Sequence, residues 1–303
     1  RLFDGWIGWA LGLAYLLVVF LGFVDRFILM LHCTSHRPLY KKEWRFLSHY
    51  IPWVIGPFMG ETPETYYAHH ITMHHPENNL ETDLSTTMPY TRDSAVDFFR
   101  YWAKFFFLAV FDLSRYFAKR KRYERIRKFL AGELSFYALC VGLSFYDWRP
   151  TLVVFVIPFL IVRFLMMCGN WGQHAFVDGY APGNAYRNSI TCINTRYNRR
   201  AFNDGYHIIH HLKPAMHWTE EPAELRANEA KYREERAIIF DGIDFFQVWM
   251  LLMFKRYDVL AKHFVDLEET KRTDDEIVAL LKERTRAIHR EKNAEGVLVP
   301  VAA

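Results

Sequence analysis

Residues 6–31 form one long apolar stretch, interrupted only by a charged pair near its end. As a helix rising about 1.5 Å per residue, this stretch exceeds the roughly 30 Å hydrocarbon core of a bilayer. It therefore predicts a transmembrane helix. Residues 129–146 and 151–167 are two further apolar runs, separated by the turn-forming sequence DWRP, and they predict a helical hairpin in the membrane. The expected fold class is all-α, with multi-pass membrane helices.

Ten of the 14 histidines gather in four groups that follow or adjoin these apolar runs. Residues three or four apart share one face of an α-helix, so each larger group should present two or three imidazoles in one direction. His69 competes with His70 as a ligand, and helix geometry favours His70 because it lies four residues before His74. The candidate metal ligands are His32 and His36 in the first group, His70, His74 and His75 in the second, the isolated His174, and His207, His210 and His211 in the third multi-histidine group, or third box.

The types of side chain in these groups indicate which metal they bind. Neutral imidazole is the commonest metal ligand in proteins. The four cysteines are scattered and form no CxxC pair, which argues against a thiolate zinc site or an iron–sulfur cluster. Nine histidines are enough for two ions. Imidazole suits zinc, copper, iron and nickel alike. Metal ions that keep open coordination positions beside a lipid phase favour redox chemistry on O2. We therefore expect two Fe ions. We expect no catalytic residue beyond the metal site.

The position of the histidines relative to the membrane sets the expected topology. All of them must lie on one side to share metals, so the chain between groups crosses an even number of times. Residues 44–60 are then interfacial or re-entrant, and residues 98–117 form an aromatic helix in the interface, with a plain transmembrane span as the alternative. Basic residues, above all the run 119–128, flank the histidine side. The positive-inside rule places that side in the cytoplasm, stroma or matrix.

Two regions follow from this topology. Residues 1–177 are expected to hold the membrane and interfacial helices with the first, second and isolated histidine groups. Residues 178–303 are expected to form a cytosolic-side helical cap that carries the third histidine box. Within the cap, residues 219–240 should form an exposed amphipathic helix with Thr219 as its N-cap, and Thr273 should cap a final helix. Residues 243–254 are apolar but too short to span.

The overall composition fits a membrane protein with a sizeable soluble cap. The chain is 51% hydrophobic and 24% charged, and its apolar residues are concentrated in a few runs. Its net charge of +4 is too modest to suggest that it binds nucleic acid.

The order and spacing of the histidine boxes resemble those of the integral-membrane fatty acid desaturases and their hydroxylase relatives, over about residues 10–220. The resemblance implies a di-iron centre that activates O2 and removes hydrogens from an acyl chain. Box one is HxxxH and box two is HxxxHH, where many members have HxxHH. By position, His32 and His36 match the first box, His70, His74 and His75 the second, His207, His210 and His211 the third, His174 the extra histidine, and Asn170 an asparagine that reaches the metal through water.

The function implied by this resemblance is that of an O2-dependent membrane fatty acyl desaturase that introduces a C=C bond. A lipid hydroxylase, a desaturase-like accessory subunit of a larger membrane complex, and a zinc-dependent membrane hydrolase remain as alternatives. The implied partners are an acyl lipid or acyl-CoA substrate, the lipid bilayer, and a separate electron donor such as a b-type cytochrome or a ferredoxin. Six carboxylates near the boxes are candidates to orient the ligating imidazoles, with a solvated surface acid as the alternative for each. They are Glu61, Glu64, Glu77, Glu81, Asp83 and Asp204, of which Asp204 is favoured.

Overall fold

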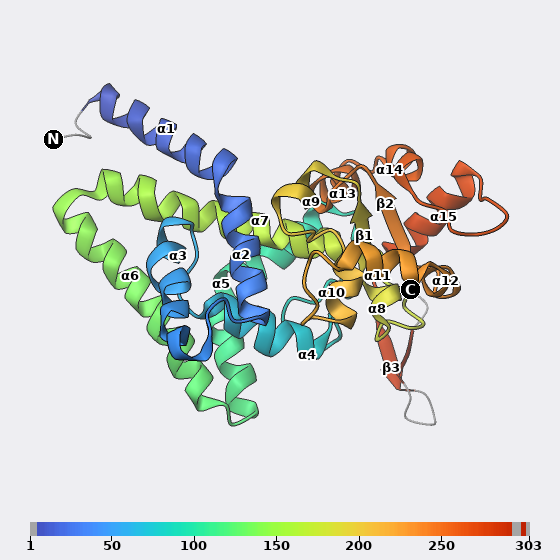
Figure 1. Cartoon of the computed structure of the whole chain (residues 1–303), viewed down its shortest axis with the longest axis horizontal. Helices are drawn as coiled ribbons and strands as arrows, with labels where there is room; N and C mark the ends of the chain where they lie inside the picture. Colours follow the sequence, from blue (N-terminus) through green and yellow to red (C-terminus); the bar gives the residue numbers. More distant parts are fainter. Residues whose placement is uncertain (1–4, 293–297, 301–303) are drawn as a thin grey trace. The chain divides into compact units, whose positions relative to one another are not determined.

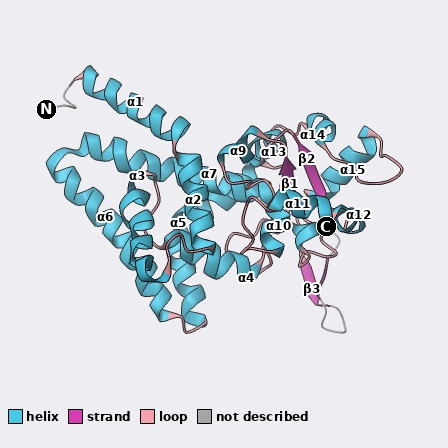
Figure 2. Cartoon of the chain, in the orientation of Figure 1, coloured by secondary structure: helices cyan, strands magenta, loops and turns pink. Residues whose placement is uncertain are grey.

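The computed structural model describes residues 5–292 and 298–300. By its internal contacts the chain divides into two compact units, each built from two separate stretches of sequence (Figure 1). Unit 1 comprises Arg1–Met73 and Phe106–Met166, and unit 2 comprises His74–Phe105 and Met167–Ala303. Most of the described residues are helical, as expected, and the strands are few and short (Figure 2).

The N-terminal apolar stretch is not the single unbroken helix that the sequence predicts. Helices α1 (Trp6–Gly22) and α2 (Val24–His36) are bent by 48° relative to each other at Phe23. Two local features explain the bend. Glycine is a poor helix former, and Gly22 ends α1. The Arg26 side chain also donates a hydrogen bond to the Gly22 carbonyl at 2.9 Å. As expected, α2 carries the first two histidines at its C-terminal end.

The next part of unit 1 is a series of short helical turns. They are a 3₁₀ helix η1 (Lys42–His49), a π-helix η2 (Ile51–Ile55), helix α3 (Gly56–Phe58) and a second π-helix η3 (Tyr67–His74). Prolines and glycines interrupt this region, which explains why no long helix forms here. The expected interfacial position of residues 44–60 remains a prediction.

Three long helical segments follow. They are α5 (Ala95–Lys119), α6 (Tyr123–Thr151) and, after the π-helical η4 (Leu152–Val156), α7 (Ile157–Gln173). The predicted turn at DWRP is present as a break in the helical backbone at Asp147 (φ −155°, ψ 111°), where the helical run changes direction (Figure 1). The aromatic helix predicted at residues 98–117 lies within α5.

Among the described residues, one helical run is long and apolar enough to cross a membrane, namely Tyr123–Gln173. The bent α1–α2 pair would make a second if it counts as one span. These findings fit membrane association. The multi-pass arrangement remains a prediction.

Unit 1 buries an ion pair among its apolar helices. Glu133 on α6 and Arg163 on α7 are 1% and 5% exposed, and the Arg163 guanidinium lies 2.5 Å from the carboxylate. The hydroxyls of Thr62, Thr65 and Tyr137 donate hydrogen bonds to the same carboxylate at 2.6–2.8 Å. Buried charges are stable only when paired and hydrogen-bonded, and here both conditions are met.

A close backbone approach positions the segment that carries these threonines. A Cβ at Gly132 would lie 1.8 Å from the carbonyl oxygen of Pro63, so only glycine fits at this point of α6. Because Gly132 lets the backbone of residues 62–65 reach the helix, the threonine hydroxyls can contact the neighbouring Glu133.

Glu61 lies next to this network but remains outside it. Its side chain is buried, and its Oε1 atom has no hydrogen-bond partner. Burial raises the pKa of Glu61 to about 8, and the nearby Glu133 carboxylate adds to the rise, while Arg163 opposes it. Glu61 is therefore largely protonated at neutral pH.

The raised pKa of Glu61 predicts a pH-dependent stability. The unfolded chain loses this proton near the ordinary pKa of 4.5, whereas the folded protein keeps it up to about pH 8. The folded state binds more protons in this window, so stability should fall as the pH rises from about 4.5 to about 8. Glu61→Gln should reduce this fall. Thermal midpoints of the purified chain and the variant across this range measure the difference, and parallel curves would contradict the prediction.

Unit 2 contains strands that the all-α expectation did not foresee. Strands β1 (Ile190–Ile193) and β2 (Ile238–Asp241) pair in parallel, with Ile190 opposite Ile238. Strands β3 (Arg290–Lys292) and β4 (Leu298–Pro300) pair antiparallel. Isoleucine-rich runs favour strands, but a run of four residues is too short to be distinguished from a buried helical turn by periodicity. The all-α prediction is corrected in this respect.

Unit 2 also contains a series of short helices. They are α4 (His75–Glu77), α8 (Ala185–Asn188), α9 (Arg196–Arg200), α10 (His207–Leu212), α11 (Glu221–Ala227), α12 (Glu229–Glu234), α13 (Phe245–Met253), α14 (Tyr257–His263) and α15 (Asp274–Arg284). The core is formed by the strands with α13, α14 and α15, through buried residues such as Cys192, Phe240, Val248, Leu260 and Leu281.

Capping residues explain which helix predictions succeed. Thr273 forms a capping box, so α15 begins where predicted. Asp244 forms a second capping box at the start of α13, which lies within the apolar residues 243–254. The helix predicted over residues 219–240 is wrong in its cap and its extent, because α11 begins at Glu221 with Glu220 as its N-cap. Instead, α11 and α12 are separated at Asn228, whose side-chain amide donates to the carbonyl of Glu224 at 2.8 Å.

Candidate metal centre

Four imidazoles from three separate stretches of chain meet inside unit 2. His74 is the last residue of η3, His174 follows α7, and His207 and His211 share one face of α10 because they are four residues apart. One ring nitrogen from each of the four lies within 4.8 Å of the others. We call this set the four-histidine group.

The ring nitrogens of the four-histidine group face one another at short distances. His207 Nε2 lies 3.3 Å from His174 Nε2 and 3.0 Å from His211 Nε2. Burial, followed by the neighbouring His74, lowers the pKa of His174 to about 3. Burial and the other histidines likewise lower the pKa of His211 well below its ordinary value. Both rings are therefore neutral at physiological pH, which is the form that binds metals.

The outward nitrogens of two of these rings are held by fixed acceptors. His74 Nδ1 lies 2.7 Å from the buried Asp83 carboxylate, and His174 Nδ1 lies 3.1 Å from the Asn188 carbonyl oxygen. Backbone N–H groups of Asn79 and Ser85 donate to Asp83 and fix it in turn. An Nδ1–H donor leaves the Nε2 lone pair facing inward. This arrangement is typical of metal-ligating histidines, so the group fits a metal ion.

Replacing Asp83 with asparagine should weaken metal binding without removing a ligand. Loss of such an orienting partner typically lowers metal affinity by about ten- to a hundredfold. The measurement is the metal retained by the purified chain during competition with a chelator. Asp258→Asn, which changes an exposed carboxylate paired with Arg256, is the control. Equal retention by the parent and Asp83→Asn would contradict the assigned role.

Unit 1 brings together three other predicted ligands. His32 and His36 project from α2, and the His70 ring centroid lies 4.6 Å from that of His32 and 5.4 Å from that of His36. Tyr66 stacks on His70 at 5.2 Å. His70, which helix geometry favoured over His69, is thus the residue that completes this triad. Three imidazoles would leave coordination positions open on a bound ion.

We expected the histidines of each box to point in one direction. In the second and third boxes they do not, and the histidines of each box belong to different groups. Residues 67–74 form a π-helix, whose wider turn separates the directions of His70 and His74. His70 joins the triad of unit 1, and His74 joins the four-histidine group of unit 2. The remaining candidate ligands, His75 and His210, face each other within unit 2, with their Nε2 atoms 2.9 Å apart.

Other predicted and unpredicted residues lie around the four-histidine group. The Asn170 amide donates to the Ser85 carbonyl at 3.1 Å and the Tyr101 hydroxyl at 2.6 Å, and its contact with a metal through water remains a prediction. Asp204, the favoured orienting carboxylate, accepts a hydrogen bond from Gln173 at 3.3 Å. Asn188 was not foreseen, because no spacing rule links it to His174.

The chain is mostly helical and contains an apolar run of membrane length. Its imidazoles converge in buried groups whose outer nitrogens are oriented. These features define a helical protein with histidine groups that could hold metal. A sequence model of the family described as "Fatty acid desaturase" matches residues 5–242. The chain therefore belongs to the fatty acid desaturase family, as its boxes predicted. Family membership supports a desaturase- or hydroxylase-like oxidoreductase function, a metal cofactor and membrane association. Searches of curated proteins and of solved structures gave no match.

Proposed function

We propose that this protein is an O2-dependent membrane fatty acyl desaturase that uses two irons to introduce a C=C bond. The observation that carries the proposal is the buried four-histidine group in a chain of this family. Four imidazoles with converging nitrogens have no evident use in packing, because they place polar atoms against one another in a mostly buried site.

The proposal assigns one ion to each of two sites. The four-histidine group holds one iron in unit 2, and the triad of His32, His36 and His70 holds one in unit 1. His75 and His210 are proposed as further ligands, and Asn170 as a ligand through water. Bound iron would supply the O2-dependent oxidation of an unactivated methylene, which side chains alone cannot perform. The chain's own residues keep His174 and His211 neutral through burial, orient His74 and His174 through Asp83 and Asn188, and exclude bulk water.

Iron is proposed over zinc because the family's reactions are oxidations, and zinc has no redox role. Imidazole itself would suit either metal.

The proposed partners and location follow from the family and the sequence. The substrate is an acyl lipid or acyl-CoA, and electrons come from a separate donor, a b-type cytochrome or a ferredoxin. The protein is multi-pass, with the metal centre on the cytoplasmic, stromal or matrix face. The apolar run Tyr123–Gln173 and the basic run 119–128, which extends from the end of α5 into the start of α6, support this placement.

Product analysis tests the proposed reaction. The full chain, purified under reducing conditions and returned to lipid with O2, a reductant and acyl substrates, should carry about two irons and form an alkene. An alcohol product with the same iron content would indicate the hydroxylase. Iron without turnover, together with tight co-purification of other membrane subunits, would favour the accessory-subunit alternative. Zinc in place of iron would reject the proposal.

A further inference from the structure

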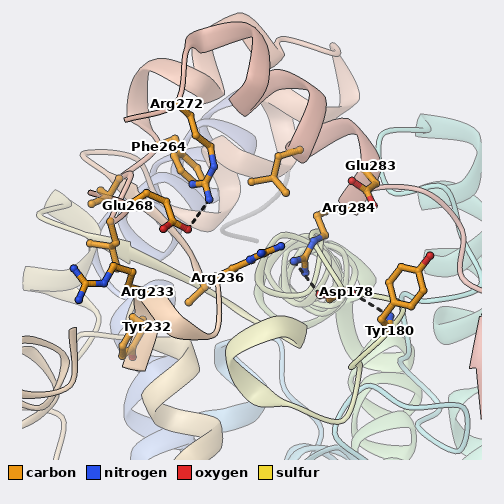
Figure 3. A pocket seen from close by; sticks show the side chains of 14 residues that line it. Asp178, Tyr180, Tyr232, Arg233, Arg236, Phe264, Glu268, Arg272, Glu283 and Arg284 are labelled. Atoms are coloured by element: carbon orange, nitrogen blue, oxygen red, sulfur yellow. Dashed lines mark hydrogen bonds and ion pairs between the residues drawn. The ribbon is translucent and has the colours of Figure 1, made fainter. Parts of the chain in front are cut away.

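Unit 2 contains a pocket of about 300 Å³ whose lining includes four arginines and none of the candidate metal ligands (Figure 3). Arg233 and Arg236 come from the end of α12 and the turn after it, Arg272 precedes α15, and Arg284 ends α15. Phe264 contributes an apolar side. Side chains from three stretches of chain thus place guanidinium groups around one cavity.

Three of these arginines already have carboxylate partners. Arg272 contacts Asp266 at 2.7 Å and Glu268 at 2.8 Å. Arg284 contacts Asp178 at 3.0 Å, and Arg233 lies 3.7 Å from Glu269. Arg236 differs, because its guanidinium has no carboxylate partner among the residues that the structure describes. Figure 3 shows its side chain extending across the pocket toward Arg284.

Two guanidinium groups contact the Asp178 carboxylate. Arg284 lies 3.0 Å from it and Arg187 lies 3.5 Å from it, and Arg187 has a second carboxylate partner in Glu235 at 3.0 Å. Burial lowers the pKa of Arg284, and repulsion from Arg187 and Arg236 adds to this effect, although the Asp178 and Glu283 carboxylates oppose it. Glu283 also lines the pocket, and both Glu283 and Arg236 are exposed whereas Arg284 is buried. An added anion would relieve this repulsion.

We propose that this pocket binds the phosphate group of a ligand, with Arg236 and Arg284 as its contacts. Guanidinium groups match phosphate oxygens in both geometry and charge. A cavity of about 300 Å³ is at the small end of ligand pockets, so it holds a phosphate-bearing head and not a whole acyl lipid. The phosphate comes from a soluble phosphoanion or from a lipid headgroup. The proposal does not depend on the metal centre.

The backbone conformation at Arg236 allows a substitution that removes the guanidinium without straining the fold. Arg236 has φ +53° just after α12, a left-handed conformation that favours glycine, and the next N–H bonds the Tyr232 carbonyl at 2.9 Å. Lys255 after α13 has the same φ of +53°, and there the next N–H bonds the Leu251 carbonyl at 2.8 Å. Lys255 does not line the pocket. Arg236→Gly and Lys255→Gly therefore remove one positive charge each, at matched helix ends, and both relieve backbone strain.

The first arm of the test is a calorimetric titration of the full chain in neutral detergent with pyrophosphate. We expect saturable binding by the parent, an affinity about tenfold or more lower in Arg236→Gly, and no change in Lys255→Gly. Neither variant should lower the thermal midpoint, because glycine suits both positions. A loss seen only in Arg236→Gly therefore reflects the missing guanidinium and not a damaged fold.

The second arm identifies the source of the phosphate. The chain is placed in phosphatidylcholine nanodiscs with and without phosphatidic acid, and its thermal midpoint is compared. A rise with phosphatidic acid that Arg236→Gly abolishes would identify a headgroup, whereas binding only in the first arm identifies a soluble phosphoanion. The proposal is overturned by an absence of saturable binding in both arms, or by equal losses in the two glycine variants. Neither result depends on iron content, so a failure here is distinct from a failure of the proposed reaction.

Discussion

His207→Ala should release the iron of the four-histidine group and leave the other ion in place, so that the iron content falls from about two to about one per chain. His207 is central to the group, since its Nε2 atom lies within 3.3 Å of both His174 Nε2 and His211 Nε2. Alanine supplies no ligand in its place. Metal analysis of the purified variant, with its thermal midpoint as a check on folding, measures the effect.

Three further variants separate loss of a ligand from general damage. His289→Ala removes an exposed histidine outside every group and should retain both ions. His32→Ala should remove the ion assigned to the triad of unit 1, and combining it with His207→Ala should remove both. Unchanged iron in His207→Ala, or a loss of both ions in that single variant, would reject the assignment of one ion to each group.

Arg163→Met is expected to lower the free energy of unfolding by about 3–5 kcal/mol, the typical cost of removing one partner of a buried ion pair. The reason is that the Glu133 carboxylate would remain buried with only hydroxyl donors from Thr62, Thr65 and Tyr137. Denaturant unfolding of the full chain in detergent measures the loss.

A double variant distinguishes the ion pair from the packing of Arg163. Glu133→Gln combined with Arg163→Met removes both charges and keeps a hydrogen-bonding group opposite the hydroxyls, so most of the stability should return. Arg256→Met, which breaks an exposed pair with Asp258, should cost no more than about 1 kcal/mol. A double variant as unstable as Arg163→Met alone would show that the charge was not the cause.

Local signals in the sequence were sufficient for much of the fold. The apolar runs predicted the long helices, and the capping residue Thr273 predicted the start of α15, because both depend on neighbours a few residues away. The bend at Phe23 and the β1–β2 pair were missed. The first results from a local backbone change, and the second from pairing between segments that are far apart in the chain.

The candidate site was predictable in its membership but not in its grouping. Residue type alone identified the histidines, yet their division among groups depends on the π-helix at residues 67–74, which spacing rules for an α-helix do not describe. The acceptors of the outer nitrogens depend on tertiary placement. Asn188 lies 14 residues after His174, and no periodicity links them.

The Glu133–Arg163 pair bears on how the chain is inserted during synthesis. A lone charged side chain at the centre of a span opposes translocon-mediated insertion by about 2.5–3.5 kcal/mol. Under the proposed multi-pass arrangement, with Glu133 on α6 and Arg163 on α7, each helix would carry such a cost if it left the translocon by itself. Once joined, the two charges neutralise each other. We therefore expect α6 and α7 to partition into lipid together, as one preassembled pair, and not one after the other.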